Sequence, residues 1–273
     1  MSTKPIEQKV FVLHSRPFQE NQLLIELLTE HKGKISALVY VGQSKRSIKK
    51  GMMQPFLPLK LTFKDNNTSL KRITHVETTA PSYVLSKDNL YSGFYINELL
   101  VRLINEDIVC EALFNQYQLT LSALSENLPI APQLRQFELC LLAELGLSFD
   151  FSPVFNENSD NVAGFYYVAE QGFVPAYQYA ITTINTPWFN TEHLQVIAEH
   201  IHHDKVLLHK DAAQTFKLLM RLVINHLLDG KPLNSRKLFT KKQIESRDKY
   251  VSNSGNKTTD KIREKHERDF IRR

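Results

Sequence analysis

A dense group of cations in the segment Gln43–Gly51 is the clearest candidate for chemistry in this sequence. The four cations within these nine residues are Lys45, Arg46, Lys49 and Lys50. Lysine and arginine side chains release counterions when they bind phosphates, so such a segment can provide much of a sequence-independent affinity for nucleic acid. Tyr40, Phe56 and Phe63 lie in the flanking segments, and an exposed ring there would stack on a base. For each ring alone, a place in the core is the simpler interpretation.

The charges of the whole chain fall into three blocks. Residues 1–80 hold 13 Lys and Arg against 6 Asp and Glu, and residues 236–273 again hold 13 against 6. Residues 81–235 hold only 8 Lys and Arg against 17 acidic residues. Basic ends around an acidic middle favour a polyanionic partner, most often nucleic acid, over a merely solvated surface. The candidate DNA-binding residues are Arg16, Lys34, Lys45, Arg46, Lys49, Lys50, Lys60, Lys64, Lys71 and Arg72.

Half of the ten histidines fall between residues 193 and 209 and form the candidate metal site. They are His193, His200, His202, His203 and His209, with Asp204 among them. Imidazole and carboxylate groups suit zinc and other transition metals. The segment lacks a ligand motif such as H-E-x-x-H, so exposed histidines at helix ends are the favoured interpretation. A metal-dependent hydrolase built on these histidines remains an alternative function.

No other pattern favours catalysis. The chain has no glycine-rich phosphate loop, no G-x-S-x-G motif and no paired-carboxylate motif. Its two cysteines, Cys110 and Cys140, are too few for a disulfide framework or a zinc cage, and we expect them to be small buried side chains. These features predict a non-enzymatic protein without a cofactor or a bound metal, in a reducing compartment such as the cytoplasm.

The first 80 residues, which must position the cations, are predicted to form strands. The five β-rich runs are Lys9–Ser15, Leu23–Thr29, Lys34–Val41, Leu59–Lys64 and Leu70–Thr79. In the fourth run apolar and polar residues alternate, as in a strand with one buried face. Five short strands suit a small barrel, and the oligonucleotide-binding (OB) fold is the five-stranded barrel that binds nucleic acid. A generic RNA-binding OB protein is therefore a second alternative.

Beyond Pro81 the pattern becomes helical. The predicted helices are 88–106, 111–126, a third from Pro132 to about Gly146, 191–202 and 211–229. Residues 150–190 are rich in aromatic residues, Asn, Gly and Pro, and predict an irregular module with a hairpin at Phe165–Phe173. We predict an α+β chain with an OB domain at 1–80, a mostly helical domain at 81–240 and a flexible basic tail at 241–273. The sequence has neither an apolar run that would span a membrane nor a secretory signal.

Several segments, in a fixed order, together resemble one bacterial family. They are Val12–Pro17, Leu23–Glu30, Gln54–Phe56, Tyr91–Leu100, Leu134–Leu139, Leu145–Gly146 and Gly230–Arg236. In these segments the chain resembles the RecO family of recombination mediators, and the part beyond Thr240 has no clear counterpart there. The resemblance implies an OB fold, a helical domain and no catalytic activity.

The resemblance also implies partners. Members of the family bind single- and double-stranded DNA, anneal complementary strands and act with RecR. They bind the C-terminal tail of the single-stranded DNA-binding protein and help RecA to replace that protein on DNA. We therefore expect a monomer that mediates recombination in DNA repair.

One departure from the resembled family concerns zinc. Many relatives carry four zinc-binding cysteines in the region that corresponds to about 150–180, but Phe149–Pro175 contains no Cys and no His. The module is therefore predicted to be zinc-free and to be held together by aromatic packing. Its predicted core comprises Phe151, Phe155, Phe165, Tyr166, Tyr167 and Phe173.

Arg135 is the candidate anchor for a partner's tail. With Pro132 at the first helical position, Arg135 lies near free backbone N–H groups that favour an anion. Leu139 and Leu142 follow it on the same helix face and would add an apolar patch. A peptide that ends in a hydrophobic residue and a free carboxylate fits this surface, and the tail of the single-stranded DNA-binding protein resembles such a peptide. An internal ion pair between Arg135 and Glu138 is the alternative.

Overall fold

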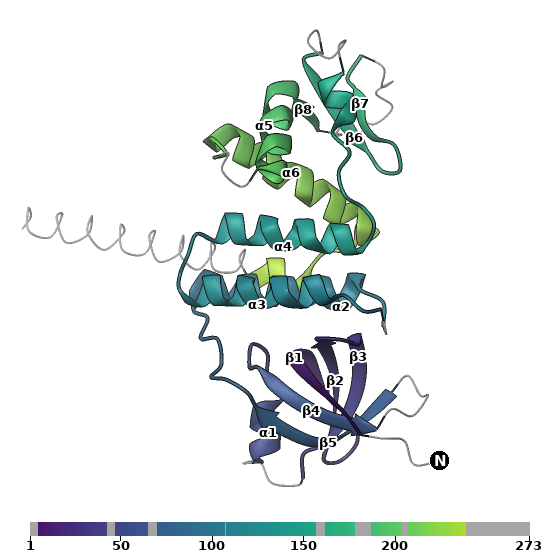
Figure 1. Ribbon diagram of the computed structural model, residues 1–273, viewed down its shortest axis with the longest axis vertical. Helices are drawn as coiled ribbons and strands as arrows, with labels where there is room; N and C mark the ends of the chain where they lie inside the picture. Colours follow the sequence, from purple (N-terminus) through teal and green to yellow (C-terminus); the bar gives the residue numbers. More distant parts are fainter. Residues whose placement is uncertain are drawn as a thin grey trace, which may run out of the picture.

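The computed structural model describes residues 5–42, 47–64, 70–106, 108–156, 162–177, 187–203 and 207–238. A β-barrel forms one end of the molecule, three helices cross the middle, and a small sheet with two more helices forms the other end (Figure 1). This arrangement confirms the predicted α+β class and the order of strands before helices. Within the described ranges, no helix is both long and apolar enough to cross a membrane.

The barrel is the predicted OB fold. Its strands are β1 (Pro5–Pro17), β2 (Gln22–Thr29), β3 (Gly33–Tyr40), β4 (Leu59–Lys64) and β5 (Leu70–Thr78). They close in the order β1-β2-β3-β5-β4, with β3 and β5 parallel and the other neighbours antiparallel. The short helix α1 (Ile48–Met52) precedes β4. Each strand therefore has an inner face in the barrel core and an outer face that meets helices or solvent.

Three helices follow the barrel in the chain, and the first two of them lie against its outer face (Figure 1). They are α2 (Lys87–Leu103), α3 (Glu111–Ser125) and α4 (Ile130–Glu144), close to the predicted positions. α4 begins two residues before Pro132, so this proline occupies the third helical position and not the predicted first one. Proline is tolerated there because the N–H groups of the first turn have no partner within the helix. Gly146 follows α4 with φ of +72°, as a residue just beyond a helix end commonly does.

β1 is longer than the predicted run Lys9–Ser15 because it borders two cores. Val12 faces the barrel interior, whereas Phe11 and Leu13 pack with the helices. The register of β1 against β2 shifts just after Val12. There the Leu13 carbonyl accepts a hydrogen bond from the Asn97 side chain of α2 at 3.0 Å. The barrel therefore has a core of its own in its interior, and its outer face shares a second core with the helices.

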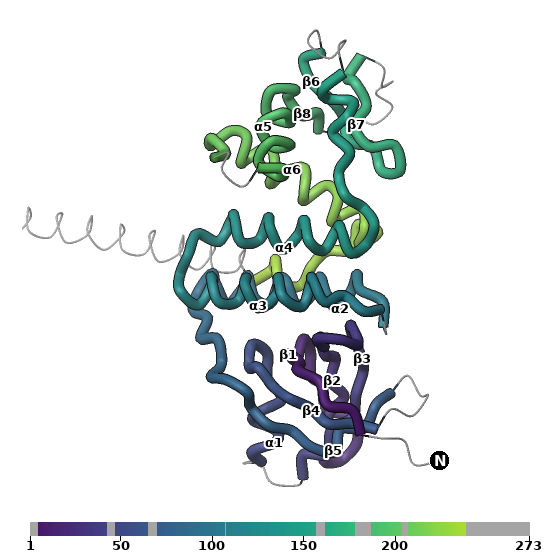
Figure 2. Tube along the Cα trace, in the orientation of Figure 1, coloured from purple at the N-terminus to yellow at the C-terminus, as the bar shows by residue number. Residues whose placement is uncertain are grey.

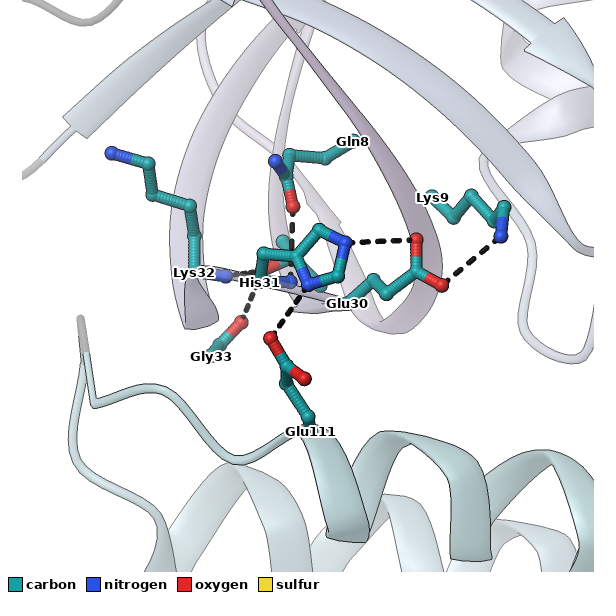
Figure 3. Close-up of polar contacts among 8 residues, drawn as sticks. Gln8, Lys9, Glu30, His31, Lys32, Gly33 and Glu111 are labelled. Carbon is teal, nitrogen blue, oxygen red and sulfur yellow. Dashed lines mark hydrogen bonds and ion pairs between the residues drawn. The ribbon is translucent and has the colours of Figure 1, made fainter.

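The turn between β2 and β3 makes a polar contact with α3 (Figure 3). His31 Nδ1 lies 2.7 Å from Glu111 Oε1, and His31 Nε2 lies 3.5 Å from Glu30 Oε2. Glu30 also pairs with Lys9 at 3.0 Å, so the contact extends to β1. The His31 backbone N–H donates to the Gln8 side chain at 3.1 Å, which holds the turn in place.

The same turn approaches the chain before α3 very closely. Gly33 has φ of +63°, and a Cβ atom at this position would lie 1.7 Å from the carbonyl oxygen of Ile108. Next to it, Lys34 Nζ donates to the carbonyl of Val101 at 2.7 Å. Glycine is required at position 33 for both its conformation and its size.

The far end of the molecule is a small sheet packed on two helices. Its elements are the 3-10 helix η1 (Ser152–Phe155), β6 (Gly164–Val168), β7 (Gly172–Pro175), β8 (Trp188–Asn190), α5 (Thr191–His202) and α6 (Lys210–Leu227). β6 and β7 confirm the predicted hairpin, whereas β8 was not predicted. Most of the predicted aromatic core is buried or half-buried, but the prediction for Phe155 is wrong because its side chain is 51% exposed. The preceding residue, Val154, is buried in its place.

The segment after α6 returns to α2 (Figure 2). Leu233 is buried in the shared core. The Glu98 carboxylate of α2 accepts the backbone N–H groups of Asn234 at 2.9 Å and Ser235 at 2.8 Å, and the Ser235 hydroxyl at 2.7 Å. Burial alone would raise the pKa of Glu98, but these hydrogen bonds hold it below its usual value. The predicted tail at 241–273 lies outside the described residues.

Candidate nucleic-acid interface

A row of four side chains crosses the outer face of the barrel. The strand registers pair Arg16 of β1 with Leu24 of β2, Leu24 with Leu38 of β3, and Leu38 with Arg72 of β5. Both arginines are exposed and both leucines are half-buried. The row covers three steps between neighbouring strands along the barrel wall, each of about 4.8 Å. This cross-strand row therefore has a cation at each end and an apolar centre.

Two aromatic side chains lie beside the cross-strand row. Tyr40 occupies the next outward position on β3, opposite Gln22 of β2, and is 60% exposed. Phe18 lies in the β1–β2 turn and is 37% exposed. Its backbone N–H donates to the Gln22 carbonyl at 3.0 Å, which keeps the turn close to Tyr40. Cations that bind phosphates together with exposed rings and apolar side chains that stack on bases make a surface suited to single-stranded nucleic acid.

The structure contradicts two of the predicted DNA-binding residues. Lys34 is 9% exposed and donates to the Val101 carbonyl, so it joins the barrel to the helices. Lys71 is 7% exposed, and the register places it beside the buried Ala37. Composition alone cannot separate these lysines from Arg72, because the fold decides which strand face is covered.

Lys60 is a third predicted cation with a different environment. Its Nζ lies 2.8 Å from Glu77 and 3.2 Å from Glu7 on the neighbouring strands. The hydrogen bonds to Glu77 and then to Glu7 raise the pKa of Lys60, and the same contact lowers the pKa of Glu77. The face of β1, β4 and β5 therefore carries carboxylates beside its lysine and is a poor phosphate site.

The basic segment 43–51 is described only in part. Lys45 and Arg46 lie outside the described residues. Lys50 is exposed on α1 and Lys49 is half-buried there. Lys64, at the end of β4, is exposed as well. The structure therefore leaves three of the predicted cations of this region accessible to solvent at least in part.

Two of the three rings considered for stacking are core residues. Phe63 is fully buried inside the barrel, and Phe56 is 5% exposed and packs on Phe94 of α2 with ring centroids 5.5 Å apart. Only Tyr40 of the three is exposed. The simpler interpretation is therefore confirmed for Phe56 and Phe63, and Tyr40 remains a candidate for stacking.

Arg135 forms the internal ion pair that was the alternative to a binding role. Its Nη2 lies 2.5 Å from Glu138 Oε1, which also accepts the Tyr95 hydroxyl at 2.6 Å. Glu138 is fully buried, and burial raises its pKa whereas Arg135 and Tyr95 lower it. Arg135 Nε and Nη1 are enclosed without a hydrogen-bond partner among the described residues. The guanidinium lies in the second turn of α4, away from the free N–H groups of the first turn.

The apolar patch predicted next to Arg135 belongs largely to the core. Leu142 is 1% exposed and packs with α5 and α6, which contradicts its predicted role in binding. Leu139 is half-buried against the same cluster. This helix face packs against the part formed by β6, β7, β8, α5 and α6, which we call the distal module, and the sequence pattern could not show this contact.

The histidine region shows local contacts. His193 Nδ1 lies 2.9 Å from the Thr215 hydroxyl, and His209 Nδ1 accepts the Ala212 N–H at the start of α6. Asp204 lies outside the described residues. No group of three His, Cys, Asp or Glu side chains that could hold a metal ion occurs among the residues that the structure describes. Burial raises the pKa of both Cys110 and Cys140 to about 11, which disfavours the thiolates that bind metals.

Sequence reasoning missed the centre of the candidate interface. Leu24 and Leu38 lie in β-rich runs whose apolar residues follow one another, so neither was predicted to face solvent. Phe18 was not assigned to a site. Alternation along β2 gave a signal, because Leu24 shares its outward face with Gln22 and Glu26. Which side of β2 faces solvent became clear only from its register with β1 and β3.

Family models match most of the chain. The model of the N-terminal part of recombination protein O matches residues 1–82, and the model of its C-terminal part matches residues 86–187. A DNA repair protein RecO from Cellvibrio japonicus is 36% identical over 237 residues, which are 85% of this chain and 96% of that protein. RecO proteins of Pasteurella multocida and Haemophilus influenzae are also 36% identical, over 85% of this chain and 94% and 95% of theirs.

Among solved structures, an asparaginyl-tRNA synthetase of Entamoeba histolytica aligns with 50% of this chain and 30% of its own, at a TM-score of 0.26 and 14% identity. These values are too low to indicate a common fold.

Proposed function

Because the chain belongs to the RecO family of DNA repair proteins, we propose that it binds single-stranded DNA across the outer face of its barrel and anneals complementary strands. The observation that supports this proposal is the cross-strand row, in which Arg16 and Arg72 flank the half-buried Leu24 and Leu38 beside the exposed Tyr40. The arginines would contact phosphates, and bases would lie over the apolar centre.

Annealing follows from the same charges. Two DNA strands repel each other, and a surface that neutralises part of each strand lowers the barrier to their meeting. The block 236–273, with its excess of Lys and Arg, would contribute a second basic region. The acidic block 81–235 would keep DNA away from the helices and leave them free for protein partners.

We further propose the partners of the resembled family: RecR, RecA indirectly, and the C-terminal tail of the single-stranded DNA-binding protein. The carboxylate of that tail would compete with Glu138 for Arg135, whose side chain keeps 15% of its surface exposed and whose Nε and Nη1 have no hydrogen-bond partner among the described residues. Leu142 is left out of the site because it is buried. We place this activity in the cytoplasm, where the bacterial chromosome lies.

Annealing of complementary oligonucleotides coated with single-stranded DNA-binding protein tests the proposal. The variant with both Arg16→Ala and Arg72→Ala should anneal more slowly than the wild type. Its salt slope for single-stranded DNA should fall by about 1.4, because each lost phosphate contact contributes about 0.7. Lys60→Ala removes a cation outside the row and is the matched control. Wild-type annealing and an unchanged slope in the double variant would place the DNA elsewhere.

The same preparation separates the alternatives. RNA that competes as well as DNA for the barrel would favour a generic RNA-binding protein. Stoichiometric bound metal together with hydrolytic activity would favour the histidine-based hydrolase.

A further inference from the structure

Glu26 is an unusual residue for a surface that binds a polyanion. It lies on β2 with its side chain on the outer face, one outward position from Leu24 of the cross-strand row. The registers place it opposite His14 of β1 and Ser36 of β3. A carboxylate on this face repels phosphates. Glu26 therefore lowers the affinity of the face for a DNA backbone, and its presence there needs another explanation.

The carboxylate of Glu26 lacks the partners that a half-buried charge normally has. Its Oε2 is enclosed by protein and has no hydrogen-bond partner among the described residues. Ser36, its neighbour on β3, directs its hydroxyl to Glu106 Oε1 at 2.5 Å. Glu26 forms no ion pair with its other neighbour, His14, in the described part of the chain. Oε1 is not enclosed in this way, so a donor that a ligand brings would reach the carboxylate there and would compensate for part of its lost hydration.

The surrounding groups determine which part of a DNA strand would meet Glu26. Arg16 and Arg72 attract the phosphates to the two ends of the neighbouring row, and Glu26 repels them from its own position. Leu24 and Leu38 offer the apolar surface between the arginines. A base that lies on this apolar surface would therefore turn one of its edges, and not its phosphate, towards Glu26.

We propose that Glu26 reads base edges and favours bases with an exocyclic amino group over thymine. This inference rests on the proposed binding of single-stranded DNA to the same face. Cytosine N4 and adenine N6 donate hydrogen bonds, and carboxylates accept readily from cytosine N4. Thymine presents carbonyl oxygens where cytosine and adenine carry their amino groups, and a carboxylate repels these oxygens. Glu26 thus makes the barrel sensitive to base composition without sequence-specific recognition.

Binding of oligodeoxycytidylate and oligothymidylate of equal length, each labelled with a fluorophore, tests this proposal. Both are pyrimidine strands, so the comparison removes most of the difference in stacking. The wild type should prefer the cytosine strand by about tenfold or more, as for one hydrogen bond to a charged acceptor. In Glu26→Gln this preference should fall to about twofold or less, because the side chain then offers a donor as well as an acceptor.

Glu20→Gln is the matched control. Glu20 is exposed in the β1–β2 turn, and its replacement removes the same charge near the same end of the barrel. It should strengthen binding of both strands equally and leave their ratio as in the wild type. Thermal unfolding of both variants confirms that each is folded.

The results separate the two proposals. Equal strengthening of both strands by Glu26→Gln, with an unchanged ratio, would overturn base reading and leave Glu26 as a repulsive charge only. A wild type that binds both strands with equal affinity would overturn it as well. Failure of the wild type to bind either strand would overturn the proposed DNA face itself.

Discussion

Replacing Arg135 with alanine separates a stabilising role of the buried polar cluster from a binding role. Arg135 Nη2 and the Tyr95 hydroxyl both contact Glu138 Oε1, at 2.5 Å and 2.6 Å, and the Glu138 side chain is fully buried. The variant leaves this carboxylate without its counter-charge, and breaking a buried ion pair costs about 3–5 kcal/mol. We expect a loss of about 3 kcal/mol in the free energy of unfolding. The value is at the low end because Arg135 Nε and Nη1 are already enclosed without partners in the wild type.

The dependence of this loss on pH has a definite sign. Burial raises the pKa of Glu138, and the charge of Arg135 lowers it, so the substitution raises it further. A carboxyl group whose pKa is higher in the folded state than in the unfolded state binds its proton more tightly when folded. The destabilisation is therefore complete above the pKa of the folded state and decreases as the pH falls through it. The difference between Arg135→Ala and the wild type should shrink as the pH is lowered from neutral through the raised pKa of Glu138.

Urea unfolding at several pH values measures this difference. The double variant Arg135→Ala with Glu138→Gln is the control, because glutamine still accepts the Tyr95 hydroxyl but carries no charge. It should recover much of the lost stability near neutral pH and show a weaker dependence on pH. A pH-independent loss that is equal in the single and the double variant would refute the assignment to an unpaired carboxylate. Titration of a tail peptide into the folded variant then measures the binding role separately, with an expected loss of about 1.5–3 kcal/mol.

Four further predictions follow from single features of the chain. The first variant reverses the charge of the basic segment by changing Lys45, Arg46, Lys49 and Lys50 to Glu. Its salt slope for single-stranded DNA, measured by titration at several salt concentrations, should fall by about 3, and its circular dichroism should not change. Glu98→Ala should destabilise the protein by about 2 kcal/mol in urea unfolding, because the carboxylate accepts three hydrogen bonds from Asn234 and Ser235. The pKa of Glu98 is lowered in the folded protein, so this carboxylate stabilises the fold above its unfolded-state pKa, and that stabilisation is lost as the pH falls through its folded-state pKa. On acidification Glu98→Ala should therefore lose less stability than the wild type does. Gly33→Ala should cost more than about 2 kcal/mol, because φ is +63° and the new Cβ would meet the Ile108 carbonyl; a normal melting temperature would contradict the close approach of barrel and helices. The purified protein should hold less than one zinc per chain by elemental analysis, and a chelator should leave its melting temperature unchanged; one tightly bound zinc would instead support the histidine region.

Local sequence patterns predicted the succession of elements in this chain. Apolar alternation located β4, and β-rich runs located the other four barrel strands to within a few residues at most ends. Helical periodicity located α2, α3 and α4, and Gly146 correctly indicated the end of α4. These features depend on the periods of 2 and 3.6 residues and on the conformation of single residues, which neighbouring residues in the chain largely determine.

The candidate site could be predicted only in part. The basic composition of residues 1–80 indicated nucleic acid, and Arg16 and Arg72 prove to be exposed on one strand face. Lys34 and Lys71, with the same charge and in the same strands as the site, prove to be buried. Composition gives the number of cations in a segment, but solvent exposure depends on what packs against each strand.

Sequence patterns alone thus predict which segments form strands and helices, and composition shows that residues 1–80 and 236–273 carry an excess of positive charge. The packing of the folded chain sets which side of each strand is open. It buried Leu142 under the distal module, paired Arg135 with Glu138, and aligned Arg16, Leu24, Leu38 and Arg72 across four strands. The physical reason is that register and coverage arise from contacts between residues far apart in the chain. A shift of one residue in register exchanges the two faces of a strand, and no local pattern specifies that shift.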